Sequence, residues 1–180
     1  MGLRNRDGRY GWASRMLHWA TAAVVIAAIP LGLKLHGMQL SLSTLWLFGL
    51  HKTLGISALA LILVRLLWHR ASPVPPLRSG APGWQDRAAL IVHRSFYVVL
   101  VVQPLSGWVA SSATGIDTVV FGRWTLPAIA SASPVWEAAA FAVHRVLGYL
   151  LIGLIVLHVA GALHRTAVLR DGTLWRIIRG

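Results

Sequence analysis

The chain has 180 residues, of which 56% are hydrophobic and only 12% are charged. This composition is typical of a membrane protein, and the sequence predicts a single membrane domain over residues 1–180. There is no cysteine, which excludes disulfides, iron–sulfur clusters, thiolate metal sites and covalent C-x-x-C-H haem attachment. The formal net charge of +12 does not indicate a nucleic-acid partner, because the arginines flank the apolar stretches.

Four apolar stretches are long enough to cross a bilayer, which takes about 20 helical residues. They predict an all-α membrane protein, an up-down bundle of four transmembrane helices over residues 16–35, 42–68, 88–111 and 140–163. The connection between the third and fourth spans contains several glycines and prolines. It is expected to be mostly irregular, with room for one short interfacial helix. No N-terminal signal peptide is expected, since the first apolar run carries no small-residue cleavage pattern.

Basic residues are distributed unequally between the two sides of the predicted bundle. One side, with both termini, holds Arg4, Arg6, Arg9, Arg15, Arg65, Arg70, Arg78, Arg87, Arg94, Arg165, Arg170, Arg176 and Arg179. The other side holds only Lys34, Lys52, Arg123 and Arg145. By the positive-inside rule, both termini are predicted to be cytoplasmic.

Two histidines, His144 and His158, lie fourteen residues apart in the fourth span. Fourteen residues are two heptads, so in a left-handed bundle both side chains lie on one face, about 21 Å apart along the axis. One helix therefore presents an imidazole to the bundle interior near each membrane surface. Ionisable residues inside a membrane span are costly and by default indicate function.

Histidines of the other spans match these two in depth. His51 opens the string HKTLG, which resembles the HRVLG string that His144 opens. Each string has a glycine one turn after its histidine, where a flat macrocycle could approach the backbone. His18 and His93 both lie at the depth of His158, and the spacing alone does not choose between them. His36 and His69 are expected to be interfacial residues without a cofactor.

Facing imidazoles at two depths of a helix bundle predict two noncovalent b haems, each held by two axial histidines. Zinc or copper fits less well, since a structural site typically takes four ligands. Lys52 and Arg145 are candidates to pair with haem propionates or to extend to the membrane interface. Arg65 and Arg94 are the corresponding candidates at the inner depth.

At this point the sequence resembles the bacterial cytochrome b561 family of four-helix dihaem membrane cytochromes, over nearly its whole length. The matching segments are Leu17-His18-Trp19, His51-Lys52-Thr53-Leu54-Gly55, Pro104-Leu105-Ser106-Gly107, Phe121-Gly122, Leu126-Pro127, the pair His144 and His158, and Leu169-Arg170-Asp171-Gly172-Thr173-Leu174. The resemblance implies that His18 and His158 hold the inner haem and that His51 and His144 hold the outer one. It also implies electron exchange with the quinone pool in the bacterial inner membrane.

The function expected from these features is electron transfer across the membrane. A superoxide:ubiquinone oxidoreductase would use the basic outer residues Lys34, Lys52, Arg123 and Arg145 to attract the superoxide anion. Ubiquinone would accept the electrons, with His93, Arg94 and Arg65 as candidates for quinone binding or proton transfer. One alternative is a haem-bearing membrane anchor for a partner dehydrogenase or hydrogenase. The other is a haem-free transporter or proton channel that uses the histidines as a relay.

Overall fold

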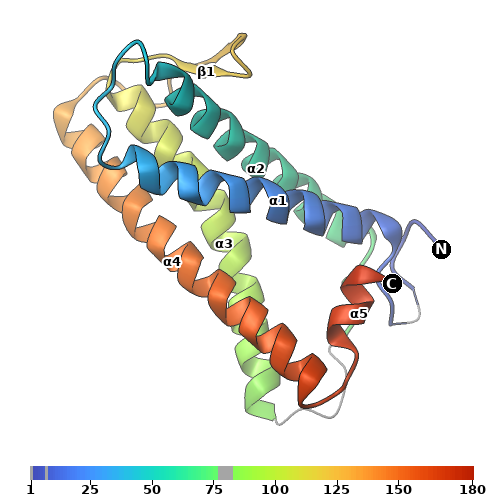
Figure 1. The fold of residues 1–180 in the computed structure, drawn as a ribbon. Helices are drawn as coiled ribbons and strands as arrows, with labels where there is room; N and C mark the ends of the chain where they lie inside the picture. The colour runs from blue at the N-terminus through green and yellow to red at the C-terminus, as the bar shows by residue number, and fades with distance from the viewer. Residues whose placement is uncertain (1, 7, 77–82) are drawn as a thin grey trace.

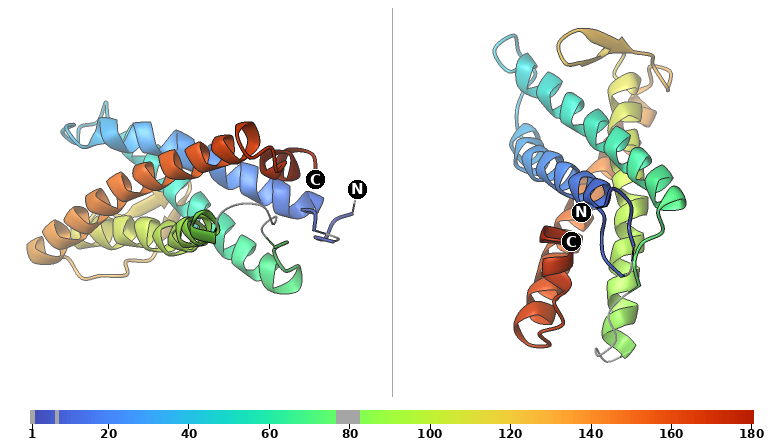
Figure 2. Two further views of the ribbon diagram at one scale, coloured as in Figure 1. Left: turned by 90° about the horizontal axis from the view of Figure 1, so that it is seen from below. Right: turned by 90° about the vertical axis from the view of Figure 1, so that its right-hand side faces the viewer.

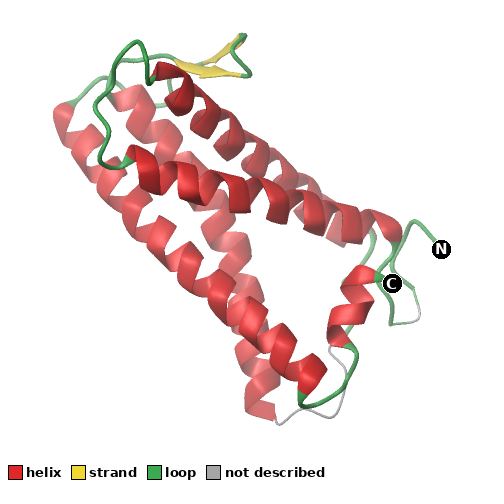
Figure 3. Cartoon of the chain, viewed as in Figure 1, coloured by secondary structure: helices red, strands yellow, loops and turns green. Residues whose placement is uncertain are grey.

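The computed structural model describes residues 2–6, 8–76 and 83–180, and nearly all of its regular structure is helical (Figure 3). In chain order, its elements are α1 (Trp12–Leu35), α2 (Leu45–Ala71), α3 (Gly83–Ala113), β1 (Thr118–Val120), β2 (Trp124–Leu126), α4 (Pro134–Ala167) and α5 (Thr173–Ile178). The helices α1 to α4 are each long and apolar enough to cross a membrane. The predicted fold class, a bundle of four membrane-spanning helices, is therefore confirmed.

The helices extend beyond the spans expected from hydropathy. α4 begins at Pro134, six residues before the predicted start, because Ser133 caps it: its hydroxyl accepts a hydrogen bond from the Trp136 N–H at 3.4 Å. α3 likewise begins at Gly83, and Asp86 in its first turn complements the helix dipole. These polar ends carry no apolar signal, so a hydropathy pattern does not detect them.

The connection between α3 and α4 contains a β-hairpin. The prediction of a short interfacial helix there was wrong, since the described residues form the antiparallel pair β1–β2. The β-branched run Thr118–Val120 favours a strand, and the left-handed backbone of Phe121 and Gly122 reverses the chain. The hairpin is held on α2, because Lys52 donates to the Asp117 carbonyl at 3.1 Å and the Thr53 hydroxyl accepts from the Phe121 N–H at 2.9 Å.

The bundle consists of two antiparallel helix pairs, α1 with α2 and α3 with α4. Figure 1 shows that the pairs diverge toward the end of the molecule that carries both termini. In the two views of Figure 2 the termini again lie close together, with α5 beside them. The cytoplasmic placement of this end stays a prediction, and Arg78, one of the arginines on which it rests, lies outside the described residues.

A network of charged and polar groups joins the elements at this end. Arg165 at the end of α4 pairs with Asp86 of α3 and with Asp171, each at 2.7 Å. Burial alone would raise the pKa of Asp171, but hydrogen bonds from Thr173 and Arg165 hold that pKa below its usual range. The Trp19 indole donates to the Ile177 carbonyl of α5 at 3.1 Å. The tail is thereby fixed to both α1 and α4.

Each long helix repeats one interior position every seven residues, which is about 10.5 Å along its axis. The middle repeat is a buried apolar layer made of Val25, Ala58, Leu100 and Leu151. Seven residues away on one side is an outer layer of Gly32, His51, Gly107 and His144. Seven residues away on the other side is an inner layer of His18, Arg65, His93 and His158. The apolar layer therefore separates two groups of histidines.

Candidate haem-binding site

In the outer layer, His51 of α2 and His144 of α4 face each other. Their ring centres are 6.1 Å apart and their planes are nearly perpendicular, at 88°. A metal–imidazole bond is about 2 Å long and the ring centre lies about 1 Å behind the nitrogen, so two imidazoles on opposite sides of one metal are about 6 Å apart. The observed separation fits two axial ligands of one iron.

A cavity of about 420 Å³ surrounds this pair and is lined by all four long helices. Its wall is mainly apolar, and its polar side chains are those of His36, His51, Gln103, His144, Arg145 and Tyr149. Gly55 and Gly148, the glycines of the two similar strings, both line it. A mainly apolar cavity with a few convergent polar groups is the usual environment of a bound cofactor.

Two further glycines lie directly against the imidazoles. A Cβ atom on Gly32 of α1 would lie 2.8 Å from Cε1 of His51, and one on Gly107 of α3 would lie 2.9 Å from Cε1 of His144. Real Cβ atoms do not approach other atoms so closely, so any larger residue would displace the ring. Neither Gly32 nor Gly107 was predicted as a site residue, although each lies fourteen residues after an inner-layer histidine.

Hydrogen bonds orient the ring of His144. Its Nδ1 lies 2.9 Å from the Gln103 carbonyl oxygen and 3.1 Å from the Ser106 hydroxyl. A carbonyl only accepts, so Nδ1 carries the proton, and the unprotonated Nε2, which lies 3.4 Å from the Gln103 amide nitrogen, is the nitrogen that could bind a metal. By contrast, Nδ1 of His51 is buried and has no hydrogen-bond partner among the described residues.

In the inner layer, two histidines compete for the position opposite His158. The ring centres of His18 and His158 are 6.2 Å apart, which again matches the spacing of two axial ligands. His93 lies closer to His158, at 5.2 Å and nearly perpendicular. The rings of His93 and Phe96 both pack against His158 from α3. These separations favour His18 as the second ligand.

The basic candidates occupy different places. Arg145 lines the outer cavity, as does His36, which was expected to have no cofactor role. Lys52 instead donates to the Asp117 carbonyl, and Arg123 lies exposed in the hairpin turn. At the inner end, Arg94 is exposed. Arg65 lies over the ring of Tyr97, with its Cζ 5.8 Å from the ring centre.

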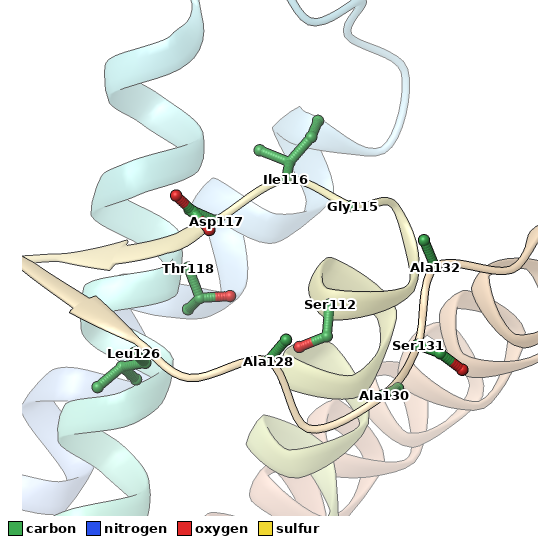
Figure 4. Close-up of a pocket in the computed structure, with 10 residues that line it drawn as sticks. All are labelled: Ser112, Gly115, Ile116, Asp117, Thr118, Leu126, Ala128, Ala130, Ser131 and Ala132. Atoms are coloured by element: carbon green, nitrogen blue, oxygen red, sulfur yellow. The ribbon is translucent and has the colours of Figure 1, made fainter.

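A second, smaller cavity of about 240 Å³ lies between the end of α3 and the connection to α4. Figure 4 shows that its lining is mostly small side chains, with Ser112 and Thr118 among the few polar ones. The Ser112 hydroxyl accepts a hydrogen bond from the Ile129 N–H at 3.2 Å, which fixes the connection on α3. None of the predicted site residues lines this cavity.

The donor sets fit haem. Within the described ranges, no group of three or more His, Cys, Asp or Glu side chains could hold a metal ion. Each histidine pair offers two nitrogens, which is what a haem iron takes from a protein when both axial positions are filled. The outer cavity, the glycines against its imidazoles and the proton fixed on Nδ1 of His144 all agree with such a group.

Comparison with known proteins gives the family. The model of the prokaryotic cytochrome b561 family matches residues 9–180. Cytochrome b561 homolog 2 of Escherichia coli K12 is 32% identical over 99% of this chain and 95% of its own length. The probable superoxide oxidase CybB of Yersinia pestis is 26% identical over 90% of this chain and 91% of its own length. Given these matches and four candidate membrane spans, the chain belongs to the prokaryotic cytochrome b561 family of multi-pass membrane cytochromes that carry b-type haem.

Proposed function

We propose that the protein holds two b haems and carries electrons from superoxide at the outer face of the bacterial inner membrane to ubiquinone. The observation that supports this most is the placement of two histidine pairs, each about 6 Å apart, at opposite ends of α4. His144 and His158 are separated by fourteen residues, or about 21 Å. When bound, the two haem irons supply one-electron carriers near the two membrane surfaces.

The chain positions these carriers. His51 and His144 bind in the outer layer, and His18 and His158 bind in the inner layer. The apolar layer that contains Leu151 excludes water and ions from the space between them. The protein therefore lets electrons pass through the bundle while it remains closed to ions.

At the outer face, Arg145 attracts the superoxide anion. It is exposed and lines the outer cavity, so its positive charge lies beside the histidine pair. Lys52 and Arg123 add positive charge at the same end, and such a field raises the encounter rate of an anion. Two superoxide anions give two electrons and leave as two molecules of dioxygen.

At the inner face, the two electrons and two protons from the cytoplasm convert ubiquinone to ubiquinol. His93 and Arg94, on adjacent positions of α3, are the candidates for contact with the quinone. The ring of His93 packs on that of His158, so a quinone beside it would lie next to the inner site. The name of the Yersinia pestis relative, a probable superoxide oxidase, supports the choice of donor.

Purified protein in vesicles should therefore reduce a short-chain ubiquinone when superoxide is added without oxygen, with one quinol formed per two superoxide anions consumed. The rate should fall as ionic strength rises, since salt screens the attraction between superoxide and the basic outer face. Arg145→Gln should lower the rate severalfold and flatten this salt dependence. The measurement is stopped-flow absorbance of quinone and haem.

Arg70→Gln, an exposed arginine in the last turn of α2, is the matched control and should react as the wild type does. If superoxide does not reduce the haem and no quinol forms, superoxide is not the electron donor. A soluble redox protein that co-purifies and reduces the haem would then favour the membrane-anchor function.

A further inference from the structure

The two histidine layers differ in charge. In the outer layer, the positions that accompany His51 and His144 are the glycines Gly32 and Gly107. In the inner layer, the position on α2 is occupied by Arg65. One layer therefore contains a permanent positive charge on an interior helix position, and the other does not.

The Arg65 side chain is half-buried in the inner layer. Its Nε is buried and has no hydrogen-bond partner among the described residues. Its guanidinium lies over the ring of Tyr97, with 5.8 Å between Cζ and the ring centre. Its position on α2, seven residues after Ala58, is in the same layer as His18, His93 and His158.

No acidic side chain in the described part of the chain neutralises Arg65. Asp86 and Asp171 pair with Arg165 at the end of the bundle. Asp117 precedes the outer hairpin, and Glu137 lies in the first turn of α4 at the outer end. Among the described residues, therefore, no protein carboxylate cancels the charge on Arg65 within the inner layer.

The basic residues next to the outer histidines, Lys52 and Arg145, do not occupy interior positions of the outer layer. Arg145 is exposed, and Lys52 is turned toward the Asp117 carbonyl of the hairpin connection. By contrast, the Nε of Arg65 is buried. Solvent screens an exposed charge far more than one held between helices.

We propose that Arg65 makes the inner site easier to reduce than the outer site, so that electrons move from the outer layer to the inner layer. A positive charge near a redox centre stabilises the state that has gained an electron, and net charge is one of the factors that set such potentials. In the transfer, the outer site loses one electron and the inner site gains it, and no proton is needed. The inference rests on the proposed function and adds the residue that favours the direction of electron flow in it.

Each site can be titrated alone in a variant that lacks the other pair. His144→Ala should keep only the haem of the inner site, and His158→Ala should keep only the haem of the outer site. The reduction midpoint potential of each remaining haem is measured by following its absorbance during a redox titration. The inner-site midpoint should lie above the outer one. Adding Arg65→Gln should lower the inner midpoint, making reduction of that site at least about tenfold less favourable. Arg65→Gln should not change the reduction midpoint potential of the outer site.

Two controls separate charge from structure. Arg65→Lys should retain most of the inner midpoint, because the charge remains. Arg70→Gln removes an exposed charge from the same helix and should leave both midpoints unchanged. An inner midpoint that lies below the outer one, or that does not move in Arg65→Gln, overturns the inference while two haem signals remain. A wild-type protein with a single haem signal would instead overturn the two-site function on which the inference rests.

Discussion

His158→Ala is expected to remove one of two b haems and to leave the other bound, because an iron that loses one of its two imidazoles is held weakly. His18→Ala should remove the same haem. His51→Ala and His144→Ala should each remove the other one. Haem content per chain should fall from about two to about one in all four variants. Low-temperature absorbance spectra of the purified variants show which haem is lost.

The matched control is His93→Ala. Its ring lies 5.2 Å from that of His158 but is not assigned as a ligand. This variant should keep both haems and exchange electrons with quinone more slowly. If His93→Ala loses a haem while His18→Ala keeps two, the inner ligand assignment is wrong.

Gly107→Ala and Gly32→Ala are expected to weaken the outer haem selectively. The added methyl group would come within 3 Å of the imidazole of His144 or His51 and would displace the ring from its position beside the iron. Overpacking of this kind costs about 1–3 kcal/mol, which corresponds to a loss of affinity of about 5-fold to 150-fold. Haem retention during dilution and gel filtration gives the measurement.

Gly153→Ala is the control for both variants. Gly153 lies in α4 between the two histidine layers, and a Cβ there would meet no atom within 4 Å. It should retain both haems and show equal or higher thermal stability, since alanine is the better helix former. If both Gly107→Ala and Gly32→Ala retain the outer haem as the wild type does, the two glycines are not required for the site.

The four spans could be predicted because the bilayer imposes a simple requirement, a run of about 20 apolar residues. What lies outside the hydrocarbon region follows other rules. The start of α4 depends on the Ser133 cap, and the hairpin depends on two left-handed residues and on hydrogen bonds to α2. Neither feature leaves a hydropathy signal, so the helix ends and the hairpin were missed.

The candidate histidines could be named from the sequence because ionisable side chains are rare in apolar spans and their depth follows from the helical rise. Depth did not separate His18 from His93, and only the family resemblance chose between them. The glycines at 32 and 107 were missed because a glycine in a membrane helix is common and its meaning depends on what lies opposite it. His36 was assigned to the outer connection, yet it lines the outer cavity. The residue that faces a cavity depends on how the helices pack, which one sequence does not contain.

The family assignment favours electron transfer over a haem-free transporter or proton channel, since the chain belongs to a family of b-type cytochromes. The central claim that remains is the number of haems and the way in which they are held. The most direct test is pyridine haemochrome analysis of the purified protein against its concentration from amino-acid analysis, with acid acetone extraction of the haem. We expect a ratio close to two haems per chain, with all of the haem extractable. A ratio close to one or zero, or haem that resists extraction, would contradict it.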